Sequence, residues 1–437
     1  MRNLVLAFML ALLGAGCTLG PDYVRPNLDM PAAWRIEAGE ANNLADTAWW
    51  GQFGDPVLSG LIDTALRENK DLLIATARIE EFEGRYGIVR ADLFPQVGAG
   101  ASYSRDQITR EAENKPAEGY ATLTETYSTT LNAAWEIDLW GRIRRSTEAA
   151  RAQLLGTEEA RRGVILSLVG NVAAAYVNLR GLDRQLEIAR NTVRSREGSY
   201  RIFQERYDGG IISLLELTQN KSQYEEAMAI IPPIEKAIAQ QENGLSVLLG
   251  RNPGPIPRGL PIEELTLPAV VAGLPSDLLE RRPDVRQAEQ ALVAANAQIG
   301  VAKAAYFPAI SLTGLFGFAS ADLKDLFRDS AQAWSYSAPV TVPIFTAGRI
   351  AGNVKAAEAI QRQALAGYRQ AVQNAFREVN DALTDQQQTG RQLDAQDKQV
   401  ASLRQYDEVA RLRYDEGYTD FLTVLDAERS LFNAELS

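Results

Sequence analysis

The sequence predicts an α+β membrane protein built from one helix–strand–strand–helix–helix unit that occurs twice. Three observations predict this fold class: short phrases recur at a nearly constant spacing, long stretches without proline carry a heptad of apolar residues, and shorter stretches alternate apolar with small or polar residues. With 437 residues, the chain is long enough for two or three domains and a sizeable core.

The duplication is marked by phrases that occur in pairs. Three pairs lie 207 or 213 residues apart: RYDGG and RYDEG (206–210, 413–417), WGRI and AGRI (140–143, 347–350), and ADLFPQV and AAYFPAI (91–97, 304–310). We therefore assign the first repeat to 57–250, a linker to 251–275 and the second repeat to 276–437.

Helices are predicted by the heptad period. Residues 72–93 carry apolar side chains at alternating spacings of three and four, and residues 285–306 repeat the pattern position for position. Such a period indicates helices that pack by knobs-into-holes contacts. Residues 141–207 keep the rhythm without any proline, interrupted once by Arg196, and residues 348–414 match them. Each of these two stretches predicts a helix about 100 Å long.

A β-hairpin is predicted in each repeat, at 96–139 and at 309–346, where apolar residues alternate with small or polar ones. Strands of roughly ten residues suit a membrane span. Trp135 and Trp334 are candidates for interfacial aromatic girdles, whereas Trp140 either joins a girdle or ends a strand. Because four strands cannot close a barrel and an open edge in lipid leaves backbone groups unpaired, copies of the chain must share the barrel.

Each RYDxG phrase predicts a tight turn between antiparallel helices, because glycine after a long helix favours a left-handed stop. Pro232 and Pro233 are expected to break the first return helix. That repeat continues to about residue 250, whereas the second ends at Ser437. By the repeat spacing, we expect roughly 20 residues that complete the last helix to be missing from the chain.

The composition excludes several classes of function. The chain contains no histidine, which rules out Ser-His-Asp triads and two-histidine zinc sites, and we expect no enzyme, no metal and no cofactor. Its net charge of −11 argues against nucleic-acid binding. The RYDxG phrases supply too few oxygen ligands for a calcium loop.

The N-terminus has the features of a secretory signal: Arg2 precedes a short apolar run that ends in GAGC. The GAGC sequence resembles a bacterial lipobox, so we expect a signal peptide at 1–16, a covalent lipid such as palmitate on Cys17, and an extended lipidated segment at 17–56. Thr18 after the cysteine resembles the outer-membrane sorting pattern. The alternative is an ordinary signal peptide with an incidental cysteine.

Four phrases carry a resemblance to a known family: WEIDLWGRIR, GLPSDLLERRPDVRQAE, YFPAISLTG and VPIFTAGRI. They resemble the TolC-like outer-membrane efflux family, in its NodT/OprM-type lipoprotein branch, over essentially the whole mature chain. The resemblance implies a homotrimer whose strands close one 12-stranded β-barrel (four strands per chain) in the outer membrane, continued by a long α-helical barrel across the periplasm.

The same resemblance implies the partners and the activity. The channel would dock on a periplasmic adaptor protein and an inner-membrane RND-type transporter, and would export drugs or other toxic solutes. A type I secretion-like export duct and a passive porin of the same architecture stay open as alternatives. A coiled-coil structural lipoprotein would leave the alternating strands unexplained.

The resemblance also assigns site residues. Positions matching Leu422 and Asp426 constrict the pore near its periplasmic end, and the position matching Arg429 helps to hold it closed. The alternative for Asp426 and Arg429 is an ordinary exposed pair on one helix face. Gln219 replaces Asp426 in the first repeat. The residues expected to contact the adaptor are those of the turns: Gly209, Gly210, Ile211, Gly417 and Tyr418.

Overall fold

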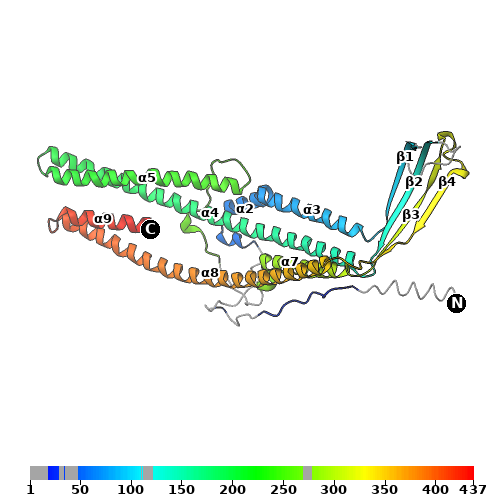
Figure 1. Cartoon of the computed structure of the whole chain (residues 1–437). Helices are drawn as coiled ribbons and strands as arrows, with labels where there is room; N and C mark the ends of the chain where they lie inside the picture. The colour runs from blue at the N-terminus through cyan, green and yellow to red at the C-terminus, as the bar shows by residue number, and fades with distance from the viewer. Residues whose placement is uncertain (1–17, 29–33, 35–47, 110, 112–121, 269–277) are drawn as a thin grey trace. The chain divides into compact units, whose positions relative to one another are not determined.

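The computed structural model describes residues 18–28, 34, 48–109, 111, 122–268 and 278–437 (Figure 1). In the first repeat the elements are α2 (Pro56–Glu68), α3 (Lys70–Ala91), β1 (Gln96–Gln107), β2 (Leu123–Ile137), α4 (Arg142–Asp208) and α5 (Leu214–Leu248). In the second repeat they are α6 (Leu278–Arg281), α7 (Pro283–Ala304), β3 (Ala309–Ser320), β4 (Gln332–Ser337), β5 (Val340–Thr341), α8 (Arg349–Asp415) and α9 (Phe421–Leu436). The order repeats, and the two long helices that the heptads predict are present as α4 and α8.

Two compact units divide the chain differently from the two repeats. Unit 1 consists of Met1–Leu28, Ala77–Ala160 and Pro283–Ala371, and unit 2 of Asp29–Thr76, Arg161–Arg282 and Val372–Ser437. Each unit takes residues from both repeats, because α4 and α8 each belong partly to unit 1 and partly to unit 2. The repeats therefore describe the duplication of the sequence, and the units describe its packing.

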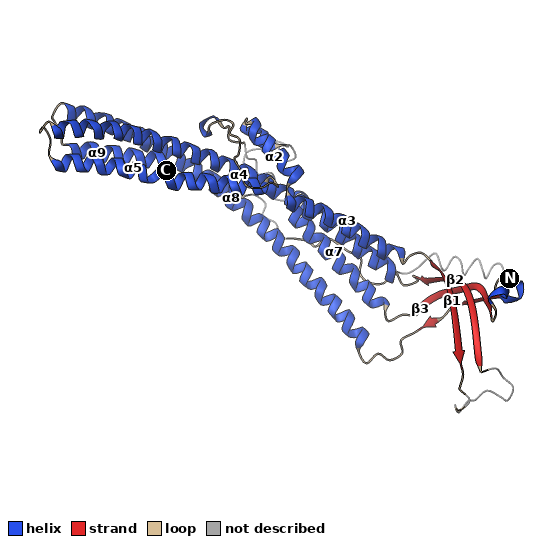
Figure 2. Ribbon diagram, turned by 90° about the horizontal axis from the view of Figure 1, so that it is seen from above, coloured by secondary structure: helices blue, strands red, loops and turns tan. Residues whose placement is uncertain are grey.

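The strands of unit 1 form one antiparallel sheet in the order β1-β2-β3-β4, with β5 also paired to β3 (Figure 2). Both predicted hairpins are present, and they pair with each other through β2 and β3, where Ile137 lies opposite Ile310. Within the described chain the outer edges of β1 and β4 have no strand partner.

The second hairpin is less regular than the alternation over 309–346 predicts. β4 ends at Ser337 and β5 is only two residues long. Pro339 lies between them and has no N–H for the ladder, although its carbonyl accepts a hydrogen bond from the N–H of Ser311 at 3.2 Å. Beyond β5, Val342 and Ile344 lie outside the strand, and the side chain of Ile344 is 98% exposed.

The predicted break at Pro232 and Pro233 is wrong, because α5 runs through both prolines. Proline inside a helix costs about 3 kcal/mol. Packing on either side of the pair offsets that cost: Ala227 and Ile234 are buried, and Glu235 pairs with Arg190 of α4 at 2.8 Å. Tertiary contacts therefore override the local preference.

A buried polar network ties the start of α2 to the linker in unit 2. Asp55 caps α2 by accepting from the N–H of Val57 at 2.7 Å. Its other carboxylate oxygen accepts from the hydroxyl of Tyr176 at 2.8 Å and from the N–H of Leu260 at 3.0 Å. The N–H of Gly259 donates to the same tyrosine hydroxyl at 2.8 Å. Burial and the bond to Asp55 raise the pKa of Tyr176 to about 12, so the hydroxyl stays protonated.

Candidate functional site

The sheet has one predominantly apolar face and one predominantly polar face. Residues directly opposite one another across neighbouring strands share a face. The apolar face contains Val97, Ala99, Tyr103, Leu131, Trp135, Leu312, Phe316, Phe318, Trp334 and Tyr336. The polar face contains Gly98, Ser102, Ser128, Thr130, Asn132, Thr313, Ser335 and Ser337, with hydroxyl pairs at 2.8 Å (Ser102 and Ser128) and 2.7 Å (Thr313 and Ser337). Such alternation suits strands with lipid on one side and water on the other.

The three tryptophans considered for the aromatic girdles occupy different settings. Trp140 follows β2, and its indole N–H donates to the carbonyl of Pro308 at 2.8 Å. It therefore links the chain after β2 to the residue before β3. The indole of Trp135 donates to the carbonyl of Leu93 at 3.0 Å. Trp334 is exposed on the apolar face and stacks on Tyr336, which is the setting that an interfacial girdle requires.

The first RYDxG phrase ends α4 in a Schellman turn. Gly210 has a φ of +71°, and its N–H donates to the carbonyl of Tyr207 at 2.9 Å. The N–H of Ile211 donates to the carbonyl of Arg206, also at 2.9 Å. These two bonds satisfy carbonyls at the end of the helix, and the positive φ explains the glycine.

The second RYDxG phrase ends α8 in the same way. Gly417 has a φ of +77°, and the N–H of Tyr418 donates to the carbonyl of Arg413 at 2.7 Å. The side chains of Tyr418 and of Ile211 in the first turn are 74% and 75% exposed. The predicted turns are confirmed, and a partner could reach both apolar side chains.

The predicted gate residues lie together on α9. The Nη2 atom of Arg429 is 3.0 Å from Oδ1 of Asp426, and both side chains are about half exposed (56% and 53%). Leu422, one turn earlier, is also exposed, whereas Val424 and Ala427 are buried against α8. The structure thus confirms the pair and places it on the face of α9 opposite its packing face. The constriction of a pore stays a prediction.

Cys17 lies outside the described residues, but the segment that follows it is fixed against unit 1. The N–H of Leu19 donates to the carbonyl of Trp140 at 3.1 Å. Further on, Nη2 of Arg25 is 2.6 Å from the carboxylate of Glu289, a buried residue of α7. The lipid on Cys17 stays a prediction.

Sequence reasoning noted Arg196 only as an interruption of the heptad, and it did not single out Glu428. Both are buried or nearly so, on α4 and α9 respectively. An arginine inside an apolar stripe was the signal available in the sequence, because a charge on the packing face of a helix requires partners. Within the described part of the chain, no group of three or more His, Cys, Asp or Glu side chains is placed to hold a metal ion.

Known proteins resemble this chain over nearly its whole length. The family model described as outer membrane efflux protein matches residues 61–251 and 274–437. The cation efflux system protein CusC of Escherichia coli (strain K12) is 38% identical over 434 residues, which cover 98% of this chain and 93% of that protein. The solvent efflux pump outer membrane protein SrpC of Pseudomonas putida is 38% identical over 436 residues, covering 98% and 92%.

Solved structures agree with these relatives. A crystal structure of CusC superposes with a TM-score of 0.86 at 37% identity, covering 96% of this chain and 95% of that one. The open state of the Neisseria gonorrhoeae MtrE outer membrane channel gives 0.86 at 32% identity, covering 96% and 93%. This chain therefore belongs to the outer membrane efflux protein family and is an efflux channel of the outer membrane, with a TolC-like combination of helices and strands.

Proposed function

We propose that the chain is the outer-membrane duct of a tripartite efflux system, a passive gated conduit rather than an enzyme. It would receive drugs or other toxic solutes from a periplasmic adaptor and an inner-membrane RND-type transporter, and release them outside the cell. The observation that carries the proposal is the amphipathic sheet of β1 to β4, which the same chain connects to two 67-residue helices.

The edges of the sheet require several copies of the chain, and the family resemblance supports three of them, a homotrimer. In lipid, the free edges of β1 and β4 would leave N–H and C=O groups without partners, at a cost of several kcal/mol each. Pairing β4 of one copy with β1 of the next removes both edges. Three copies would supply twelve strands, which is enough for a barrel with a water-filled interior.

The periplasmic gate is assigned to Leu422, Asp426 and Arg429. Around a threefold axis, three copies of Asp426 would bring like charges together, and pairing each with Arg429 would reduce their repulsion. The half-exposed position of the pair, away from the buried face of α9, supports an orientation toward a lumen.

Two further contacts complete the proposal. The turns at Gly209, Gly210, Ile211, Gly417 and Tyr418 would bind the adaptor, supported by the exposure of Ile211 and Tyr418. A lipid on Cys17 would anchor the chain in the membrane leaflet beside the strand ends, without any other cofactor.

The proposal is tested by deleting the gene in its source bacterium and measuring growth on organic solvents, on salts of several metal cations and on antibiotics. These classes are chosen because relatives are named for cation, solvent and toluene efflux. We expect sensitivity to at least one class, restored by the gene in trans. Unchanged sensitivity together with the loss of a secreted protein would instead favour the export duct. Conductance of the reconstituted protein that does not rise when Leu422 and Asp426 are replaced by alanine would favour a passive porin without a gate.

A further inference from the structure

Arg196 of α4 is a buried cation at the place where the two helical hairpins of unit 2 meet. Its residue is 5% exposed, and Nη1 donates to the carbonyl of Gln223 on α5 at 2.7 Å. The guanidinium lies over the ring of Phe432 on α9, 5.2 Å from its centre. Its Nη2 atom makes no hydrogen bond to any described residue. Burial lowers the pKa of this arginine, although its side chain stays charged at any physiological pH.

Charged groups from each of the other three helices face this cation. From α5, Glu226 approaches Arg196 to 3.8 Å. From α8 and α9, Arg411 joins two carboxylates, lying 3.0 Å from Asp407 and 2.7 Å from Glu428. Both carboxylate side chains are only 16% exposed. We call this set, together with Phe432, the charged seam.

Taking these charges out of water costs free energy that their pairing only partly returns. Burial raises the pKa of Glu428, and Asp407 adds to the rise, while Arg411 and Arg196 act in the opposite direction. The packed seam therefore binds a proton on Glu428 more tightly than a separated, hydrated seam would. By linkage, lower pH favours the packed seam, and higher pH favours its separation.

The repeat supplies a comparison within the chain. At the positions equivalent to Arg196 and Glu428, 207 residues away, the other copy has Leu403 and Lys221. A leucine would continue the apolar stripe that Arg196 interrupts. Replacing both partners of a buried ion pair by apolar side chains is often neutral or stabilising, so the presence of these charges is not by itself evidence that they hold the helices together.

We infer that the charged seam is a release element: it lowers the free energy needed to separate α9 from α4, and so makes opening of the channel reversible. The inference rests on the proposed gate, since α9 also carries Leu422 and Asp426. The direction in which conductance changes when the charges are removed distinguishes this role from a lock. If the seam were a salt-bridge lock, removing its charges would open the channel; for a release element, removal keeps it closed.

The test uses the full-length lipidated protein in planar bilayers, with single-channel conductance measured from about pH 8 to about pH 5.5. For the wild type, we expect conductance to fall several-fold toward the acidic end. R196L and E428Q should both be less conductive than the wild type at the upper end. E428Q should lose the pH dependence, because it removes the titrating carboxyl, whereas R196L should keep it with the midpoint moved to higher pH, because Arg196 lowers the pKa of Glu428.

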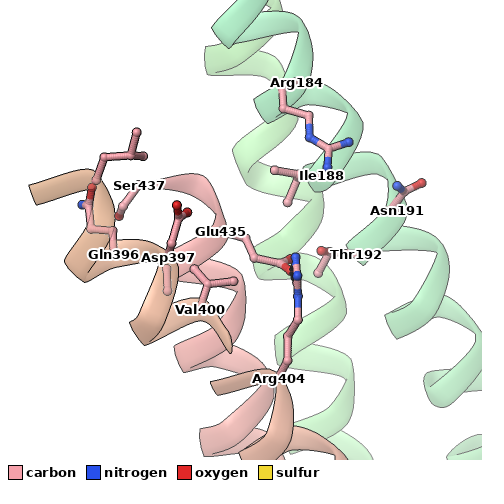
Figure 3. Close-up of a pocket in the computed structure, with 12 residues that line it drawn as sticks. Arg184, Ile188, Asn191, Thr192, Gln396, Asp397, Val400, Arg404, Glu435 and Ser437 are labelled. Atoms are coloured by element: carbon pink, nitrogen blue, oxygen red, sulfur yellow. Dashed lines mark hydrogen bonds and ion pairs between the residues drawn. The ribbon is translucent and has the colours of Figure 1, made fainter. Parts of the chain in front are cut away.

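Glu435→Gln is the matched control. Glu435 of α9 pairs with Arg404 of α8 at 2.8 Å, one heptad from the Arg411–Glu428 pair, and Figure 3 shows these two side chains pointing toward one another. Glu435 lines the same small cavity as Arg196 and Glu428 but pairs with Arg404 rather than Arg411, so E435Q should titrate like the wild type if the pH dependence belongs to Glu428. Higher conductance of R196L than of the wild type, or an unchanged pH profile in E428Q, would overturn the inference.

A failed proposal for the function would give a different result, namely no conductance from the wild type or from any variant. Should R196L or E428Q not assemble, hydrogen exchange of α9 amides in the wild type decides the question. After correction for the intrinsic pH dependence of hydrogen exchange, the exchange rate of α9 amides relative to that of α5 amides should fall toward acidic pH. Equal ratios across the range would count against a release element.

Discussion

The two long helices, α4 and α8, and the turns that end them differ in their polar residues far more than in their length and backbone. Both long helices have 67 residues and end in the same glycine turn. Three departures between equivalent positions, 207 residues apart, concern residues discussed above: Tyr176 and Leu383, Arg196 and Leu403, and Gln219 and Asp426. Duplication preserved the length and the turns, whereas each polar departure belongs to a network or a surface that only one copy has.

The largest expected effect concerns the gate pair. Replacing Leu422 and Asp426 together by alanine should raise single-channel conductance several-fold, because it removes both the bulk and the charge of the constriction. The matched change in the first hairpin, L215A with Q219A, should leave conductance close to the wild-type value. Planar-bilayer recordings of all three proteins check the comparison. Equal conductance in all three proteins would show that Leu422 and Asp426 of α9 do not form a gate.

The next effect concerns Tyr176, which the second copy replaces by a leucine. Y176F should lower the free energy of unfolding by about 1–3 kcal/mol, because Asp55 and the N–H of Gly259 each lose a buried partner. Thermal unfolding of the purified protein measures this as a lower midpoint. The exposed Tyr306 gives the control, since Y306F should shift the midpoint little. An unchanged midpoint for Y176F would show that the network does not stabilise unit 2.

Much of the fold could be predicted because it depends on local periods. The heptads gave the two long helices, and the alternation gave the sheet faces. Both errors occurred at prolines, for opposite reasons: packing carries α5 through Pro232 and Pro233, while the missing N–H of Pro339 interrupts the last strand. The sequence shows where a proline lies, but not whether the neighbouring turns are held by other helices.

The candidate site was predictable to a smaller extent. Asp426 and Arg429 were found because they are spaced i,i+3 on one helix, and a resemblance gave them a role. The partners of Arg196 come from two other helices, α5 and α9, and no spacing in the sequence brings Glu226 and Glu428 to one cation. Contacts of that kind depend on tertiary packing, so they became visible only in the structure.

A smaller and symmetric effect is expected at the turns. G210A and G417A should each lower the free energy of unfolding by about 1–2 kcal/mol, because both glycines have positive φ, and nothing lies within 4 Å of an added Cβ. The cost is then backbone strain alone, and it should be equal in the two copies. Thermal unfolding is the measurement, and G209A, at a residue without positive φ, is the control. Clearly unequal costs would contradict the structural equivalence of the turns.

The smallest effect concerns the caps of the return helices. Asp420 caps α9, and the side chain and N–H of Thr423 donate to it at 2.8 and 3.0 Å. These bonds lower its pKa below the ordinary 3.8, so the cap stabilises α9 fully above that value and is lost as pH falls through the lower folded pKa. Hydrogen exchange at Thr423 should therefore speed up at acidic pH beyond its intrinsic rate, and D420N should remove that dependence. Ser213→Ala, at the cap of α5, should cost about 1 kcal/mol there and leave exchange at Thr423 unchanged. A Thr423 amide whose protection is constant across the acidic range would show that Asp420 does not contribute to α9 through its charge.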